Sequence, residues 1–258
     1  MADLPFVPLP EAFLTAPIAH RALHDLGAGR PENSRAAMQA AVEAGYGIEI
    51  DVQLSSDGVA MIFHDYDLGR LTAERGAVAQ RSTAELSAIP LKGGSEGIPT
   101  LAEGFALVAG RVPLLIEIKD QSGALAAGPD ALERAVAQAL VGYAGPVAVM
   151  SFNPHAVAAF GALRPDLPRG LTTEEFTAED WGLVPAATRE RLSTIPDYAA
   201  TGASFLSHGV RDLAMPRVVE LKAEGARILC WTVRSAAQEA QARQVAENIT
   251  FEGYTPAP

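Results

Sequence analysis

Short β-rich runs alternate with alanine-rich helical stretches from one end of the sequence to the other, and this alternation permits few architectures. Such alternation favours parallel strands joined by crossover helices. The chain has 258 residues, close to the roughly 250 that a (β/α)8 barrel requires. We predict strands over residues 17–20, 47–54, 59–63, 112–119, 146–152, 169–173, 204–208, 227–233 and 248–252.

Nine runs are one more than an eight-stranded barrel holds, and the second connection identifies the extra one. Runs 47–54 and 59–63 are separated only by Ser55, Ser56, Asp57 and Gly58. A parallel crossover needs about a dozen residues, so these two runs must pair antiparallel. Glycine tolerates a positive φ, which makes Asp57-Gly58 a good hairpin turn. We therefore expect residues 59–63 to return as a hairpin arm above the barrel mouth.

We therefore predict an α/β fold, a (β/α)8 TIM barrel that forms a single domain over residues 1–258. Residues 65–97 fit the alternation poorly, because they hold charges and glycine clusters with one possible short helix at 83–89. We interpret them as an insertion over the barrel top, after the second strand and its hairpin. Residues 173–203 form a second irregular stretch. Helices are predicted over residues 32–44, 101–109, 131–143, 155–163, 215–224 and 236–246.

Charge and composition exclude several classes of partner. The net charge is −11, and an acidic surface repels polyanions, so we expect no nucleic-acid partner. No apolar stretch approaches the roughly 18 residues of a membrane span, and no signal peptide is evident. The expectation is a cytoplasmic monomer or homo-oligomer with a small-molecule substrate. Cys230 is the one cysteine, so no internal disulfide can form, and its apolar surroundings predict a buried thiol.

Polar residues gather at the carboxyl ends of adjacent predicted strands, where barrel active sites lie. Glu49 and Asp51 share one face of a strand because residues i and i+2 point the same way. Glu117 and Lys119 repeat this arrangement on the next barrel strand. Three converging carboxylates raise one another's pKa or hold a cation. Oxygen ligands favour a hard ion, so Glu49, Asp51 and Glu117 are candidate ligands of Mg²⁺ or Ca²⁺.

The alternative for each carboxylate alone is an ion pair. Glu49 or Asp51 can pair with Arg21, and Glu117 can pair with Lys119. A structural network rarely places three acids, two histidines and two cations at one end of adjacent strands. The combination therefore favours a functional site.

Histidines and cations at the same strand ends suit phosphoryl chemistry. His20 and His64 are candidate proton carriers, since histidine titrates near neutral pH. Arg21 offers a planar fork for phosphate oxygens and Lys119 a compact positive charge. Phosphoryl transfer is catalysed largely by positioning and charge stabilisation, which this set can supply. His24 and His155 are expected to be structural, while His208 ends a strand and its role stays open.

With these residues placed, the sequence resembles the glycerophosphodiester phosphodiesterase family of the phospholipase C-like phosphodiesterases. The family pattern is HRG, PENT, E-x-D, DG, HD, IPTL and E-x-K, in this order. Several separated motifs in one order are far more specific than any single motif. The matching residues are His20-Arg21-Ala22, Pro31-Glu32-Asn33-Ser34, Glu49-Ile50-Asp51, Asp57-Gly58, His64-Asp65, Ile98-Pro99-Thr100-Leu101 and Glu117-Ile118-Lys119.

The resemblance implies a metal-dependent hydrolase of glycerophosphodiesters such as glycerophosphocholine or glycerophosphoethanolamine, releasing sn-glycerol 3-phosphate and an alcohol. By position, Glu49, Asp51 and Glu117 match the family's metal ligands, His20 and His64 its acid–base pair, and Arg21 and Lys119 its phosphate contacts. In the family scheme the glycerol 2-hydroxyl attacks phosphorus, and water then opens the cyclic phosphate. Trp231 and Phe152 are candidates for an apolar wall near the glycerol, with core packing as the alternative.

Some residues depart from the family pattern. Ala22 replaces glycine, which restricts the backbone beside the site. Arg234 replaces the asparagine that usually follows Trp-Thr-Val, and Glu252 replaces the usual aspartate. Arg234 could contact substrate or pair with an acid.

Two alternatives remain open, and a third is disfavoured. One is a related phosphodiesterase acting on lysophospholipid or another phosphodiester, and another is a catalytically inactive binding barrel. The third, an amidohydrolase barrel, needs a His-x-His pair that this sequence lacks.

Overall fold

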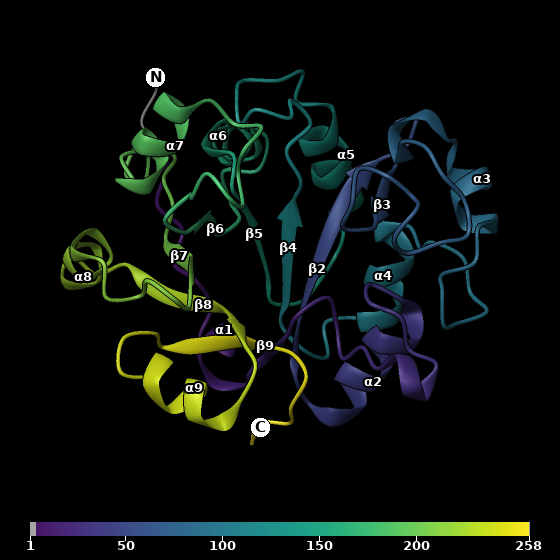
Figure 1. Ribbon diagram of the computed structural model, residues 1–258, viewed down its shortest axis with the longest axis horizontal. Helices are drawn as coiled ribbons and strands as arrows, with labels where there is room; N and C mark the ends of the chain where they lie inside the picture. Colours follow the sequence, from purple (N-terminus) through teal and green to yellow (C-terminus); the bar gives the residue numbers. More distant parts are fainter. Residues whose placement is uncertain (1–3, 258) are drawn as a thin grey trace.

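The computed structural model describes residues 4–257, and its strands form a closed (β/α)8 barrel (Figure 1). Eight strands pair in parallel, and β1 closes the ring by pairing with both β2 and β9. The predicted fold class is confirmed, including all eight barrel strands. They are β1 (Ile18–Ala19), β2 (Gly47–Leu54), β4 (Leu114–Ile118), β5 (Val147–Ser151), β6 (Arg169–Thr173), β7 (Phe205–Gly209), β8 (Arg227–Val233) and β9 (Asn248–Phe251).

The ninth predicted run is the hairpin arm and not a barrel strand. Strand β3 (Ala60–Ile62) runs antiparallel to β2, with Val52 opposite Ile62. The turn between them contains Gly58 at φ +83°, the left-handed backbone that glycine adopts without strain. The hairpin extends β2 beyond Val52, its last residue paired with β4, and β3 then runs back from the carboxyl end of β2 toward the barrel.

Most helices lie where the sequence predicts them, and side chains cap the first turns of several of them. Ser34 and Thr100 accept from the third backbone N–H of the helices that they precede. Helix α7 (Ala186–Ser193) was not predicted, because it is polar and shows no apolar stripe; the short α1 (Ala12–Thr15) was missed as well. The predicted helices are α2 (Arg35–Ala44), α3 (Thr83–Ala88), α4 (Leu101–Val108), α5 (Ala131–Ala139), α6 (Pro154–Leu163), α8 (Pro216–Ala223) and α9 (Ala236–Ala242).

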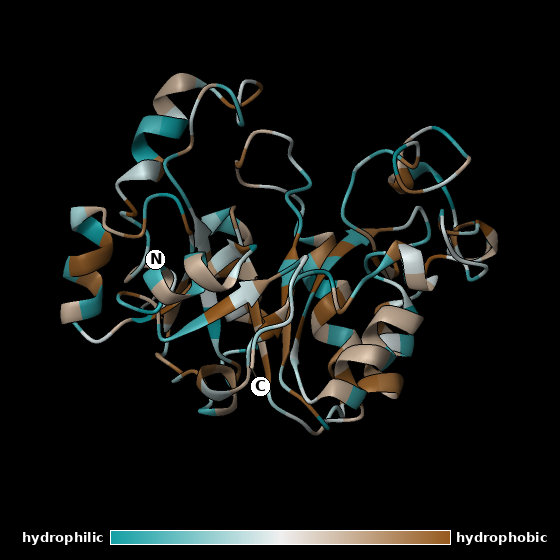
Figure 2. Ribbon diagram, turned by 60° about the horizontal axis from the view of Figure 1, so that its bottom comes forward, coloured by the Kyte–Doolittle hydropathy of each residue, from teal (hydrophilic) through white to brown (hydrophobic). Residues whose placement is uncertain are grey.

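Alternation along the strands divides the core into an outer and an inner layer. On β2, Ile48 and Ile50 join the large cluster between the strands and the helices, whereas Glu49 and Asp51 face the lumen. On β4, Ile116 packs outward in the same way. Figure 2 shows the strands as brown hydrophobic segments interrupted by teal hydrophilic ones. This period of two places acids inside the barrel without interrupting the outer core.

The amino-terminal end of the lumen is closed by apolar side chains. Phe13 of α1 is fully buried, and with Leu9 it packs on Leu115, Phe205 and other residues of the inner layer. The amide of Asn248 donates to the carbonyls of Phe13 (2.8 Å) and Ala16 (2.6 Å), which fixes α1 over this end. The lumen therefore holds a packed apolar core at the amino-terminal ends of the strands and a polar site at their carboxyl ends.

Residues 65–97 have a small apolar core of their own. Leu68, Val78, Leu86 and Leu91 pack on Met61 of β3. The segment contains the 3-10 helix η2 (Val78–Gln80) and α3, and it lies beside the hairpin (Figure 1). Within residues 4–257, no helix is long and apolar enough to cross a membrane.

Candidate active site

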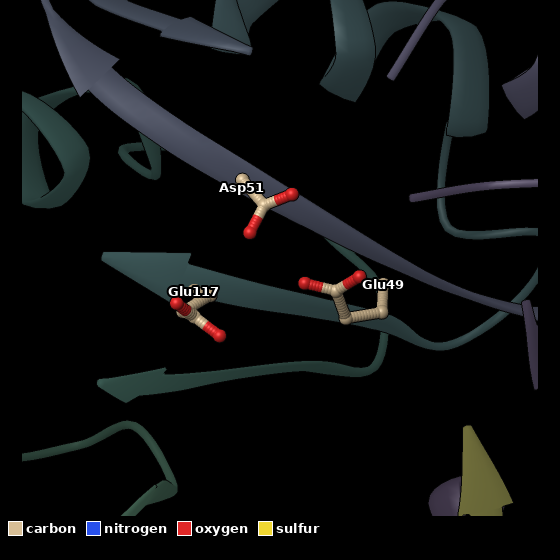
Figure 3. Close-up of side chains that lie close together, drawn as sticks. All are labelled: Glu49, Asp51 and Glu117. Carbon is tan, nitrogen blue, oxygen red and sulfur yellow. The ribbon is translucent and has the colours of Figure 1, made fainter. Parts of the chain in front are cut away.

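Three buried carboxylates from two neighbouring strands converge in the upper lumen (Figure 3). Glu49 and Asp51 extend from β2 and Glu117 from β4, where Asp51 and Glu117 are register partners. One oxygen of each lies within 4.8 Å of the others. Two oxygens bound to the same Mg²⁺ or Ca²⁺ at about 2.0–2.6 Å are at most about 5 Å apart. The structure thus brings together all three predicted ligands with a spacing that fits a hard divalent ion.

Two cations neutralise part of this negative charge. The Lys119 ammonium lies 2.6 Å from Glu117 Oε1 and 2.8 Å from Asp51 Oδ1. Arg21 Nε lies 3.7 Å from Asp51 Oδ2. The ion pairs considered from sequence therefore exist within the carboxylate cluster. With three carboxylates against two cations, they leave one negative charge without a counterion.

The excess negative charge changes the pKa values of the clustered carboxyl groups. Burial raises the pKa of Glu49 well above its ordinary value, and the neighbouring charges of Asp51 and Glu117 raise it further. Burial would also raise the pKa of Asp51, but Lys119, His64 and Arg21 outweigh it and hold that pKa far below its usual range. A divalent cation would relieve the repulsion at Glu49, so the donor set fits such an ion chemically as well as geometrically.

His20 is held at the rim of the carboxylate cluster by an acid from the last barrel strand. Its Nδ1 lies 2.6 Å from Glu252 Oε2, and Arg234 Nη2 lies 2.6 Å from Glu252 Oε1. The hydrogen bond from His20 and the nearby ring of His24, whose Nε2 lies 3.6 Å from Glu252 Oε2, hold the pKa of the Glu252 carboxyl far below its usual range. Arg234, whose role the sequence left open, therefore pairs with an acid. This arrangement fixes the ring of His20 and leaves its Nε2 for exchange of a proton.

His64 is held in the same way on the opposite side. Its Nδ1 lies 2.6 Å from Asp65 Oδ1, and Arg70 donates to both Asp65 oxygens at 2.7 and 2.8 Å. Burial raises the pKa of Asp65, but hydrogen bonds from His64 and Arg70 outweigh it and keep that pKa well below its usual range. Each candidate proton carrier is thus joined through Nδ1 to a carboxylate that an arginine neutralises.

The segment after β1 is tied to the same network. Arg21 Nη1 donates to Glu32 Oε1 at 2.8 Å, and Arg70 donates to both Glu32 oxygens. Asn33 Nδ2 donates to Asp51 Oδ2 at 2.9 Å. Glu32 and Asn33 belong to the Pro-Glu-Asn-Ser motif, so the motif acts here by orienting Arg21 and Asp51.

A cavity of about 540 Å³ opens beside these groups, with His64, Glu117 and Lys119 at one end. Trp231 and Phe152 line it, with ring centroids 5.3 Å apart and planes at 88°. The indole of Trp231 donates to the Ser207 carbonyl at 3.0 Å. The predicted aromatic wall therefore borders an open space and is only partly buried.

The other singled-out residues lie away from the carboxylate cluster. His208 is fully buried on the helix-facing side of β7, with Nδ1 2.7 Å from Thr173 Oγ1. Cys230 is buried as predicted, and burial raises the pKa of its thiol to about 12, so the thiol is protonated at neutral pH. His155 is exposed on α6.

Sequence reasoning gave no role to Arg70 or to Glu252. Glu252 directly follows β9, so the strand-end rule that selected His20 and Lys119 could have included it. Arg70 lies within the insertion, 38 residues from its partner Glu32. No spacing pattern in the sequence signals that contact.

Ala22, which stands where the family has glycine, has a left-handed backbone. Its φ is +63°, next to Arg21 at +51°. This conformation costs a residue with a Cβ about 1–2 kcal/mol. We expect Ala22→Gly to change the free energy of unfolding by less than about 1 kcal/mol, because relief of this strain offsets the lost methyl group.

The control is Ala41→Gly, a buried alanine in α2, which should cost about 1.5–2 kcal/mol. Urea denaturation measures both variants. Equal losses would contradict the strain argument.

Comparisons with known proteins agree with this geometry. Residues 20–248 match the glycerophosphoryl diester phosphodiesterase family. A glycerophosphodiester phosphodiesterase of Caldanaerobacter subterraneus is 30% identical over 213 residues, covering 79% of this chain and 80% of that protein. One from Bacillus subtilis is 29% identical, covering 72% of this chain and 71% of its own.

Solved structures give the same result. A phosphodiesterase from Oleispira antarctica, solved in complex with the product sn-glycerol-3-phosphate, superposes with a TM-score of 0.75 at 26% identity and 93% coverage of both chains. A glycerophosphodiester phosphodiesterase from Parabacteroides distasonis gives a TM-score of 0.71 at 23% identity, covering 91% of each chain. The chain belongs to the glycerophosphoryl diester phosphodiesterase family and is a phosphodiester hydrolase.

Proposed function

We propose that this enzyme hydrolyses glycerophosphodiesters, including glycerophosphocholine and glycerophosphoethanolamine, to sn-glycerol 3-phosphate and an alcohol, with Mg²⁺ or Ca²⁺ required. The observation that carries the proposal is the buried cluster of Glu49, Asp51 and Glu117 between two carboxylate-held histidines. The Oleispira antarctica phosphodiesterase, solved with sn-glycerol-3-phosphate, supports the choice of product. Glu49, Asp51 and Glu117 would hold the ion, which supplies charge stabilisation at phosphate when bound.

The two histidines divide the proton transfers in this proposal. Hydrogen bonding of Nδ1 to Glu252 or Asp65 leaves Nε2 of each ring as the nitrogen that meets substrate. His64 borders the 540 Å³ cavity, so we assign it the protonation of the departing alcohol. His20 then accepts the proton of the attacking hydroxyl, and its paired carboxylate stabilises the positive ring.

Arg21 and Lys119 contact the phosphate oxygens in this proposal. Both side chains are held by carboxylates before substrate arrives, which lowers the entropy lost when they bind it. Trp231 forms an apolar wall of the substrate site. We also propose that residues 1–258 act as one catalytic domain, in which the insertion at 65–97 supplies Asp65 and Arg70.

The test is release of sn-glycerol 3-phosphate from glycerophosphocholine and from glycerophosphoethanolamine by metal-stripped enzyme. We expect no release until Mg²⁺ or Ca²⁺ is restored. Full activity in the presence of chelator would contradict the metal requirement. If both substrates stay intact with either ion while lysophosphatidylcholine is cleaved, the glycerophosphodiester assignment fails. If all three stay intact, the enzyme acts on another phosphodiester or the chain is a catalytically inactive binding barrel.

A further inference from the structure

The 540 Å³ cavity extends away from the candidate catalytic groups into a chamber with aromatic walls. Phe152 contacts both tryptophans of the wall, with its ring centroid 4.9 Å from that of Trp181 and 5.3 Å from that of Trp231. All three rings are only partly buried, so each presents surface to the cavity. Phe176 packs behind them, 5.2 Å from Trp181. The rings form a wall that borders open space.

The Trp181 indole is fixed by a buried acid. Glu174, directly after β6, is 7% exposed, and its Oε1 accepts the indole N–H at 2.7 Å. This bond sets the plane of the ring on the loop between β6 and α7. Because Glu174 also lines the cavity, one residue supplies both the ring orientation and a negative charge.

Acidic groups outnumber basic ones in this part of the cavity. Asp120, Glu174 and Asp180 line it, against Arg211 alone. Arg211 lies 3.1 Å from Asp180 and 3.7 Å from Glu174, and its side chain is 74% exposed. Asp120 is fixed by Asn153 Nδ2 at 2.7 Å and by the backbone N–H of Leu125 at 3.1 Å. The chamber therefore presents more carboxylates than cations to a ligand, while burial raises the pKa of Glu174.

Aromatic faces combined with carboxylates favour a cation of low hydration. Ring faces attract quaternary ammonium groups, and carboxylates add attraction over a longer range. An acyl chain in the same space would displace water from these carboxylates and would offer them no positive charge in return, which is costly. A neutral polyol could donate hydrogen bonds to the carboxylates but would gain no attraction between net charges. Ethanolamine carries the charge but, as a strongly hydrated ammonium, gains less from the rings.

We propose that this chamber binds the trimethylammonium headgroup of the diester, with Trp181 and Glu174 selecting choline over uncharged headgroups. The proposal rests on the proposed function, because the chamber continues from the groups assigned to the phosphate and the leaving alcohol. It adds the substrate class, namely diesters of a quaternary ammonium alcohol.

Binding is tested without catalysis by intrinsic fluorescence. Trp181 and Trp231 are the two tryptophans of the chain, and both line the cavity. Titration with choline at constant ionic strength is expected to change the emission. The neutral isostere 3,3-dimethylbutan-1-ol should bind at least about 3-fold more weakly. In Glu174→Gln this difference should shrink. Equal affinity for the two compounds, or no response to choline, would overturn the proposal even if the enzyme is active.

Selectivity is tested by kcat/KM for glycerophosphocholine, glycerophosphoethanolamine and glycerophosphoglycerol, expected to fall in that order. Trp181→Leu should lower the ratio of the first to the last about 3- to 30-fold. Glu179→Gln is the matched control, because Glu179 is exposed on the same loop and is not among the residues that line the cavity, and this variant should leave the ratio unchanged. Equal loss on all substrates in Trp181→Leu would overturn headgroup selection while leaving the diesterase assignment intact. Preference for lysophosphatidylcholine, with loss in the cavity-lining variant Leu183→Ala, would assign the chamber to an acyl chain instead.

Discussion

Replacement of His64 by alanine is expected to lower kcat for glycerophosphocholine by about 10²–10⁴-fold, the usual contribution of a general acid. The fold should survive, because the His64 side chain is 30% exposed and follows the hairpin arm rather than a barrel strand. His155→Ala, an exposed histidine on α6, is the matched control and should retain wild-type turnover. Circular dichroism and the steady-state rates measure both properties.

A substrate with a better leaving group separates the roles of the two histidines. A p-nitrophenyl diester of glycerol phosphate needs no proton on departure, so His64→Ala should recover much of its rate on this compound. His20→Ala should stay slow on both substrates, since the attacking hydroxyl must still lose its proton. Recovery in His20→Ala but not in His64→Ala would reverse our assignment of acid and base.

Glu49→Gln is expected to abolish metal-dependent turnover and yet to stabilise the metal-free protein. The substitution removes one of three buried carboxylates that repel each other, and the Gln oxygen can still accept the Arg21 backbone N–H now bound at 2.8 Å. Single stabilising substitutions commonly raise the free energy of unfolding by about 0.5–2 kcal/mol, and we expect a gain of this size in Glu49→Gln. An ion present at a hundredfold excess over its Kd stabilises wild type by about 2.7 kcal/mol.

The order of stability should therefore reverse between chelator and saturating ion, which thermal unfolding with Mg²⁺ or Ca²⁺ can measure. Glu133→Gln is the matched control, a buried glutamate of α5 whose pKa burial raises as well. It should alter neither the ion-induced rise in Tm nor the activity. An undiminished rise in Tm in Glu49→Gln would show that the ion binds elsewhere.

The barrel and the centre of its site could be predicted from local patterns. The period of two in Glu49-Ile50-Asp51 placed both acids on the lumen side, where they lie. A connection too short for a crossover identified the hairpin, as the antiparallel register of β2 and β3 confirms. In both cases neighbouring residues determine the outcome, so the sequence alone was sufficient.

What escaped prediction depends on tertiary contacts. Helix α7 has no apolar stripe, so no periodicity indicated a helix there. The His20–Glu252 bond joins residues 232 positions apart, and it forms because β1 and β9 are adjacent when the barrel closes. The cavity is also a product of closure, since its walls come from several loops at the carboxyl ends of the strands.

Phe13 closes the amino-terminal end of the barrel lumen, and this determines where substrate can enter and products can leave. Leu9, Phe13 and Leu115 pack together at the amino-terminal end, so residues 4–257 close the lumen there. Substrate enters, and both products leave, by the opening at the carboxyl ends of the strands. In the proposed reaction the departing alcohol and the glycerol phosphate would leave through this same opening before another substrate molecule enters, and accumulated product would compete with substrate for the site.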